Sequence, residues 1–375
     1  MKKVLNLIVF LFLGLAALAQ SELTVEQNLE DYDFVVQYIE DNYAGFPDKV
    51  TSSTCADYGA MKTSLRDQVT KGEISCWDAL ARYTAWFNDR HLRLQGSFIN
   101  EDGHWIGYTD QFWLRQNIYY DEMMDEYNPT AVACKVSDKT FLIRFPSCEG
   151  NPDKKWVNNS IKQFKNSHCE NLILDIRGNG GGNDGMWIPY MLLLYDHECE
   201  LPGVEYRNSP QNIEYIKNEG GRKDILKMAV QTPEAQFLKS KADVINSKKV
   251  DSTVRKAALM IDDGVESSGE EMVLNIKACS NRVTVYGRDN TGGCLDYSNL
   301  AMVKFKNLDS YFGVPMSRRV GLPEKSIDEN GIAPDVRIDL PLPAKLTDNI
   351  DEWVIWVAEQ LENSSFKRFE SFIIK

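Results

Sequence analysis

Apolar and polar positions divide this chain of 375 residues into a helical first part and a longer part in which strands and helices alternate. In residues 26–43 and 76–87 the apolar side chains recur every three or four positions, which predicts two amphipathic helices. Residues 92–94 alternate between apolar and polar side chains and predict a short strand. Helical spacing returns at residues 350–361, where we expect a helix near the C-terminus.

The middle of the chain contains short apolar runs, and helical patterns separate them. The runs predict buried strands at residues 140–145, 172–176, 257–261 and 283–286. The patterns between and after them predict helices at residues 152–165, 184–195 and 269–279. A hairpin is expected at residues 300–305 and 311–314. Alternating strands and helices are typical of a parallel α/β sheet, so the fold class predicted is α/β.

These patterns divide the chain into an N-terminal region, a core with an insertion, and a C-terminal helix. Residues 198–250 are charged and poorly patterned, which indicates a loop-and-helix insertion. The expected parts are a signal peptide (1–19), an N-terminal helical region (20–95), connecting strands and loops (96–137), an α/β core that includes the insertion (138–345) and a C-terminal helix (346–375).

The first residues have the composition of a signal peptide. Lys2 and Lys3 precede the apolar stretch from Val4 to Leu15, and an Ala-x-Ala cleavage site ends at Ala19. We therefore expect an exported, periplasmic or extracellular protein. No later stretch is apolar for the roughly 20 residues that a membrane span needs. The net charge of −13 argues against nucleic acid as a partner, and the oligomeric state stays open.

Cysteine usage is compatible with export. The chain has eight cysteines and lacks a Cys-x-x-Cys pair, so we expect no zinc site. An oxidising compartment permits disulfides. The sequence does not give their pairing, and several of the cysteines are equally well explained as buried free thiols.

The most informative motif is an apolar strand that ends at a glycine cluster. The strand at residues 172–176 is followed by Gly178 and then by Gly180–Gly182. Glycine allows positive φ angles, so successive backbone N–H groups can converge on an anion or on the oxyanion of acyl transfer. A phosphate loop would need Gly-Lys-Ser/Thr at its end, whereas Asn183-Asp184-Gly185 follow here.

A second junction between a strand and a helix carries a serine. Ser267 follows the strand at residues 257–261 and precedes the helix at residues 269–279. A helix N-terminus offers N–H groups and positive potential to an oxyanion. Together the two junctions suggest a serine hydrolase, although a helix-capping serine is the simpler interpretation of Ser267 taken alone.

Four segments resemble, in the same order, the C-terminal processing peptidases, also called tail-specific proteases. They are Phe141–Ser147, Leu172–Gly182, the set Ile261–Glu271 with Val283–Gly287 and Thr291–Gly293, and Ile327–Val336. The resemblance covers residues 138–345, the expected core, and implies a crotonase-like (ClpP/crotonase) ββα fold. It also implies a serine peptidase that acts on protein or peptide substrates and needs no metal or cofactor.

The chain departs from the bacterial processing enzymes in two respects. Their catalytic lysine would follow the segment Thr291-Gly292-Gly293, where Cys294 and Leu295 stand instead. The PDZ domain that precedes their core would also not fit into residues 96–137. Both departures resemble the tricorn-like and retinoid-binding branch, which takes its base from a histidine in an Asp-x-His context.

Within that branch, the resemblance assigns roles to individual residues. Ser267 is the expected nucleophile, with Ser268 as the fallback. His91, in the segment Asp89-Arg90-His91, is the expected base, and His104 is a weaker alternative.

The remaining roles are less narrowly assigned. Asp328 or Glu329 would orient the imidazole ring. Gly180 or Gly181 would supply oxyanion donors together with Ser268. The alternative function is an inactive family member that binds an apolar ligand or a peptide.

Overall fold

A computed structural model of the chain describes residues 23–95, 98–99, 105–106, 130–246, 250–343 and 350–363. The predicted signal peptide and His104 lie outside the described residues. The same is true of most of the connecting segment 96–137, whose described parts hold a small pair of strands, β2 (Phe98–Ile99) and β3 (Trp105–Ile106), and the strand β4 (Val132–Lys135). In the described part of the chain, no helix combines the length and apolarity that a bilayer crossing requires.

A six-stranded sheet forms the core, and all its neighbouring strands are parallel except β4 and β5. Its strands, in spatial order, are β15 (Val336–Arg337), β12 (Val283–Gly287), β11 (Lys256–Ile261), β6 (Asn171–Asp175), β5 (Thr140–Arg144) and β4 (Val132–Lys135). The four predicted strands of the core are thus confirmed. Leu174 of β6 pairs with Leu259 of β11, so these two strands end at the same edge of the sheet. This register brings the glycine cluster beside the turn that carries Ser267.

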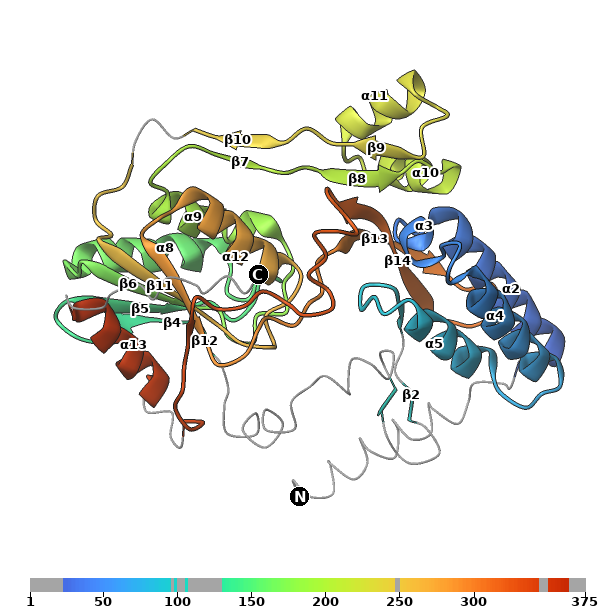
Figure 1. Cartoon of the computed structure of the whole chain (residues 1–375), viewed down its shortest axis with the longest axis horizontal. Coiled ribbons are helices and arrows are strands. Elements are labelled where there is room, and N and C mark those ends of the chain that lie inside the picture. Colours follow the sequence, from blue (N-terminus) through green and yellow to red (C-terminus); the bar gives the residue numbers. More distant parts are fainter. Residues whose placement is uncertain are drawn as a thin grey trace, which may run out of the picture.

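Helices cover both faces of this sheet (Figure 1). On one face lie α8 (Lys154–Ser167), α9 (Ile188–Leu194) and α12 (Ser268–Cys279), and on the other lies α13 (Glu352–Glu362). The predicted helix over residues 184–195 is interrupted. A short 3₁₀ turn at Asp184–Met186 precedes α9, because Pro189 fits the first turn of a helix but not its interior.

The N-terminal helices pack on a second, antiparallel sheet. They are α2 (Val25–Asn42), α3 (Phe46–Lys49), α4 (Cys55–Thr70) and α5 (Cys76–Trp86). The sheet contains β1 (Arg93–Gln95), β13 (Tyr297–Lys304) and β14 (Tyr311–Arg319), so the predicted hairpin is longer than expected. Aromatic side chains fill the space between helices and sheet, with Phe312 of β14 in edge contact with Phe34 and Tyr38 of α2.

The insertion at residues 198–250 is more regular than the sequence predicts. Besides α10 (Pro210–Asn218) and α11 (Lys223–Gln231), it contains β7 (Cys199–Leu201), β8 (Val204–Arg207), β9 (Phe237–Lys239) and β10 (Asp243–Ile245). The expectation of loops and helices alone was wrong, because strands of three or four residues are too short to show alternation. β7 pairs with β10, and β8 with β9 extends the antiparallel sheet (Figure 1).

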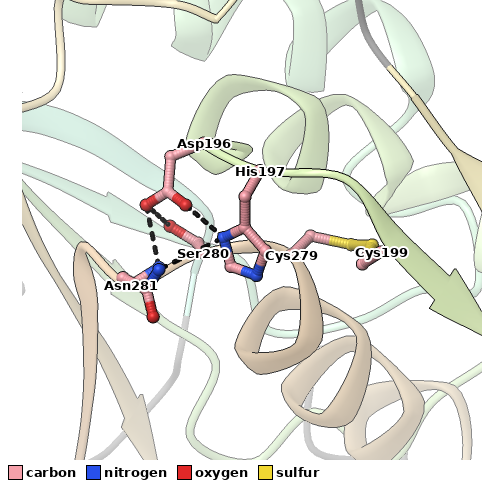
Figure 2. Close-up of a disulfide and its surroundings, with 6 residues drawn as sticks. All are labelled: Asp196, His197, Cys199, Cys279, Ser280 and Asn281. Atoms are coloured by element: carbon pink, nitrogen blue, oxygen red, sulfur yellow. Dashed lines mark hydrogen bonds and ion pairs between the residues drawn. A yellow bond between two sulfur atoms is a disulfide. The ribbon is translucent and has the colours of Figure 1, made fainter.

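One disulfide fastens this insertion to the core. Cys199, at the start of β7, bonds to Cys279, the last residue of α12 (Figure 2). Nearby, the Asp196 carboxylate accepts a hydrogen bond from the backbone N–H of Asn281 at 2.8 Å. The other six cysteines are free thiols.

Candidate active site

The turn that joins β11 to α12 holds Ser267 in a strained conformation. Ser267 has a φ of 53° and a ψ of −122°, a combination that residues other than glycine rarely adopt. Such strain persists where the surrounding contacts enforce it, and it is concentrated at functional sites. Here the Ser267 N–H donates to the Cys294 carbonyl at 3.0 Å. The sequence placed Ser267 correctly at the start of the helix, but it gave no sign of the strain.

His91 lies in the loop after α5, and its ring contacts both Ser267 and the start of β13. Nε2 lies 3.0 Å from Ser267 Oγ, and Nδ1 lies 2.6 Å from the carbonyl oxygen of Tyr297. Because a carbonyl oxygen only accepts hydrogen bonds, Nδ1 carries the proton and Nε2 accepts from the serine hydroxyl. This tautomer is the one that a general base beside a serine requires.

The surroundings of His91 keep its ring neutral at pH 7. The pKa of His91 falls from 6.5 to about 4, mainly because the ring is buried and next because Arg93 is positively charged; the bond to the Tyr297 carbonyl opposes this. Asp89 holds the loop, since its carboxylate accepts from the His91 N–H at 2.9 Å and from the Tyr43 hydroxyl at 2.7 Å. Burial raises the pKa of Asp89 to about 6.

The two acids expected to orient the imidazole take other positions. The ring nitrogen that such an acid would hold binds the Tyr297 carbonyl instead. The Asp328 carboxylate accepts from the backbone N–H groups of Leu295 and Asp296 at 2.7 and 2.8 Å, and Glu329 is exposed. The expectation of an acid side chain on this nitrogen is corrected accordingly. Sequence reasoning missed Tyr297 because a backbone carbonyl has no residue signature.

The glycine cluster packs directly against the serine turn. Gly181 has a φ of 96°, and a Cβ there would lie 2.8 Å from Ser267 Cβ and 2.9 Å from Ser268 N. Only glycine therefore permits this approach. The Gly181 N–H donates to Asn179 Oδ1 at 3.0 Å, whereas nothing lies within 4 Å of the Cβ position of Gly180.

Glu270 secures the other side of the serine turn. Its buried carboxylate accepts from the Thr291 hydroxyl at 2.5 Å, from Gly293 N at 2.9 Å and from Cys294 N at 2.7 Å. Burial raises the pKa of this carboxyl group. These bonds join the first turn of α12 to the loop at residues 291–294, and no local sequence pattern reports such a contact.

Ser267 and His91 open into a cavity of about 630 Å³. Residues of the core, of β13 and of the insertion line this cavity, so three separate segments of the chain form it. The lining is mainly polar and charged, and includes Gly182, Asp184, Arg222, Asp224, Lys241, Asp243, Glu271 and Asn299. Among the described residues, no group of three or more His, Cys, Asp or Glu side chains could hold a metal ion.

Comparison with known proteins gives a family and a fold. A model of peptidase family S41 matches residues 139–338. A candidate peptidase from Parabacteroides merdae has a similar structure, with a TM-score of 0.59, 14% sequence identity, and coverage of 92% of this chain and 99% of that one. Mature CPAF is similar at a TM-score of 0.58 and 11% identity, covering 90% of this chain and 96% of its own. These two likenesses show the fold alone. No curated protein matches the sequence.

Proposed function

Since this chain belongs to peptidase family S41 and is a serine peptidase, a hydrolase, we propose that Ser267 is its nucleophile and His91 its general base. The observation that carries this assignment is the distance of 3.0 Å between Ser267 Oγ and His91 Nε2. A serine hydroxyl is a weak nucleophile at neutral pH and needs an adjacent base. His91 is neutral there, so it is able to accept the proton.

The reaction follows from this pair. Ser267 Oγ attacks the carbonyl carbon of the scissile peptide bond while its proton passes to His91 Nε2. The tetrahedral intermediate collapses when the C–N bond breaks and His91 gives the proton to the leaving amine. Water, deprotonated by the same nitrogen, then attacks the acyl-enzyme, and Ser267 regains its proton as the carboxylic acid product leaves.

The oxyanion of the intermediate needs backbone donors beside Ser267. Ser268 N–H, in the first turn of α12, is one candidate because a helix N-terminus favours negative charge. The Gly181 N–H is already bonded to Asn179. We therefore favour Gly180 over Gly181 as the second donor.

A backbone carbonyl, rather than a carboxylate, orients the base. The Tyr297 carbonyl fixes the tautomer and the plane of the His91 ring. Asp328 acts one step further away, because it holds the two amides that immediately precede Tyr297. Asp296 reciprocates, accepting from Ile327 N at 2.9 Å and from Asp328 N at 3.2 Å. Asp328 is thus proposed as a positioning residue.

The finer fold and the destination of the chain are part of the same proposal. Strands β5, β6, β11 and β12 with their covering helices agree with a crotonase-like core, in which two strand ends meet at the active site. Export to the periplasm or the cell exterior, with removal of residues 1–19, is supported by the Cys199–Cys279 disulfide, since such bonds persist in oxidising compartments.

The family implies protein or peptide substrates. The charged lining of the cavity suits a polar peptide backbone better than an apolar ligand. The alternative of a carrier for apolar ligands therefore gains no support from the site.

Covalent labelling tests the assignment. We expect a fluorophosphonate to add one phosphonyl group to the wild-type protein, and peptide mapping to place it on Ser267. Labelling should vanish in Ser267→Ala and persist in Ser268→Ala, whose backbone N–H remains. A phosphonyl group on Ser268, or labelling of the Ser267→Ala variant, would overturn the assignment.

A further inference from the structure

The residues immediately before the two proposed catalytic residues form an ion pair. Arg90 precedes His91, Glu266 precedes Ser267, and Arg90 Nη2 contacts Glu266 Oε1. The two side chains are 8% and 16% exposed, so water screens this pair much less than a surface pair. The ion pair connects the loop after α5 with the turn before α12.

Two further contacts place the pair among the loops of the site. Arg90 Nη1 donates to the Gly292 carbonyl at 2.7 Å. The Glu266 backbone N–H donates to the Asn179 carbonyl at 3.0 Å, within the glycine cluster. A Cβ at position 292 would lie 2.8 Å from Glu266 Cγ. The paired side chains therefore connect the His91 loop, the serine turn and the loop at residues 291–294, and the Glu266 backbone connects the serine turn to the glycine cluster.

The position of the pair matters because Ser267 and His91 belong to different parts of the fold. Ser267 is fixed by the parallel sheet, whereas His91 is fixed by the N-terminal helices and the antiparallel sheet. A guanidinium group holds a carboxylate in a defined geometry because its donors form a rigid fork. A buried ion pair is weak evidence for stability, since its desolvation opposes the attraction, but it can specify one relative position of two segments.

We infer that Arg90 and Glu266 are positioning residues that hold His91 Nε2 within hydrogen-bonding distance of Ser267 Oγ. This inference rests on the proposed function, because it presupposes that these two atoms react. A displacement of about 1 Å at a catalytic group costs on the order of 100-fold in rate. Loss of the pair should therefore slow the chemical step while the fold stays intact.

The test measures how fast a small fluorophosphonate modifies Ser267, with the maximal rate constant separated from the apparent affinity. Arg90→Gln and Glu266→Gln should each lower the maximal rate constant about 10- to 100-fold, with little change in apparent affinity. The double variant should be no slower than the slower single variant, because the two side chains act as one unit. Arg90→Lys keeps the positive charge but loses the forked donors of the guanidinium group. Its maximal rate constant should lie between those of Arg90→Gln and the wild type.

The matched control is Arg66→Gln. Arg66 binds Asp33 through two hydrogen bonds of 2.8 Å, but this pair is exposed and lies on the N-terminal helices. Loss of the Arg66–Asp33 pair should leave the maximal rate constant of phosphonylation unchanged. Circular dichroism and the final labelled fraction identify any variant that fails to fold, because misfolding lowers the fraction rather than the rate constant of the folded molecules.

The outcomes separate this inference from the proposed function. If the wild type reacts at Ser267 and both Gln variants react at the wild-type rate, the positioning role is wrong and the catalytic assignment stands. The positioning role would also be wrong if the rate constant of the double variant fell by the product of the two single losses, because the two residues would then act independently. If the wild type does not react at Ser267, the proposed function fails, and the positioning role fails with it.

Discussion

Ser267 and His91 come from two regions that are built on different principles. Ser267 stands at the carboxyl edge of a parallel sheet, where the register of β6 and β11 places the glycine cluster beside it. His91 stands between helices and an antiparallel sheet, and its ring depends on the Tyr297 carbonyl, some two hundred residues away in the chain. In the parallel region, local sequence motifs supply the glycine cluster and the serine. In the antiparallel region, only tertiary packing brings His91 to the Tyr297 carbonyl. Variants in each region therefore test different parts of the account.

The largest expected effect is the loss of the base from the antiparallel region. His91→Ala should slow peptide hydrolysis by at least about 10⁴-fold, because members of a catalytic unit fail together. Steady-state assays at saturating peptide would measure this. His168, an exposed residue at the end of α8, supplies the control: His168→Asn suits its left-handed backbone and should retain full turnover. Normal turnover in His91→Ala would show that another group is the base.

In the parallel region, the largest loss of reactivity is expected from a substitution of Gly181. In Gly181→Ala the new methyl group meets Ser267 Cβ at 2.8 Å, and the backbone at a φ of 96° is also strained. We expect at least a 100-fold loss of phosphonate reactivity, on the scale set by a displacement of about 1 Å. Gly220→Ala is the matched control, since Gly220 also has a positive φ of 68° but nothing lies within 4 Å of its Cβ position. If both variants lose reactivity equally, backbone strain rather than the contact with Ser267 explains the loss.

A smaller effect is expected at Asp328, which acts on the base through the backbone. Asp328→Ala frees the amides of Leu295 and Asp296. It should lower the phosphonate rate constant about tenfold, less than the roughly 100-fold cost of displacing a catalytic group by about 1 Å, because Asp328 acts on the base only through the backbone. Glu329→Ala should change neither rate nor stability, because Glu329 is exposed. Comparison of the two variants by labelling kinetics and thermal melting distinguishes the two acids that the sequence left open. A large effect of Glu329→Ala alone would reverse the assignment.

The smallest expected effect is that of pH in the mildly acidic range. The neutral imidazole is the active form, so activity is retained above the pKa of His91 and lost as pH falls through about 4. An unperturbed histidine would instead lose most activity between pH 7 and 5.5. The free energy of unfolding changes in the same direction. Between pH 6.5 and about 4, His91 binds a proton in the unfolded chain but not in the folded chain, so stability falls as the pH drops through this range. A half-point of kcat/KM near 6.5 would contradict this.

These two regions also differ in how far the sequence predicted them. The core strands, the glycine cluster and the serine at the start of α12 were predicted correctly, because parallel strands read as continuous apolar runs that end in recognisable turns. His91 was found only through the family resemblance. The Tyr297 carbonyl and the strands of the insertion were missed, since a backbone group has no residue signature and strands of three or four residues show no period.

The contacts of Glu270, Arg90 and Glu266 could have been suspected from their positions. Each adjoins the segment of a proposed catalytic residue, and Arg90 and Glu266 carry opposite charges. Their pairing joins segments 176 residues apart, however, and no local pattern reports such a separation. What the sequence lacks is the arrangement of the two regions relative to each other, and that arrangement brings the base to the serine.

The most direct test of this account is a crystal structure of the protein after reaction with a fluorophosphonate. We predict a covalent bond from phosphorus to Ser267 Oγ, with His91 Nε2 within hydrogen-bonding distance of that group and Nδ1 still on the Tyr297 carbonyl. A phosphonyl group on another residue, or an acid side chain in place of the Tyr297 carbonyl, would contradict it.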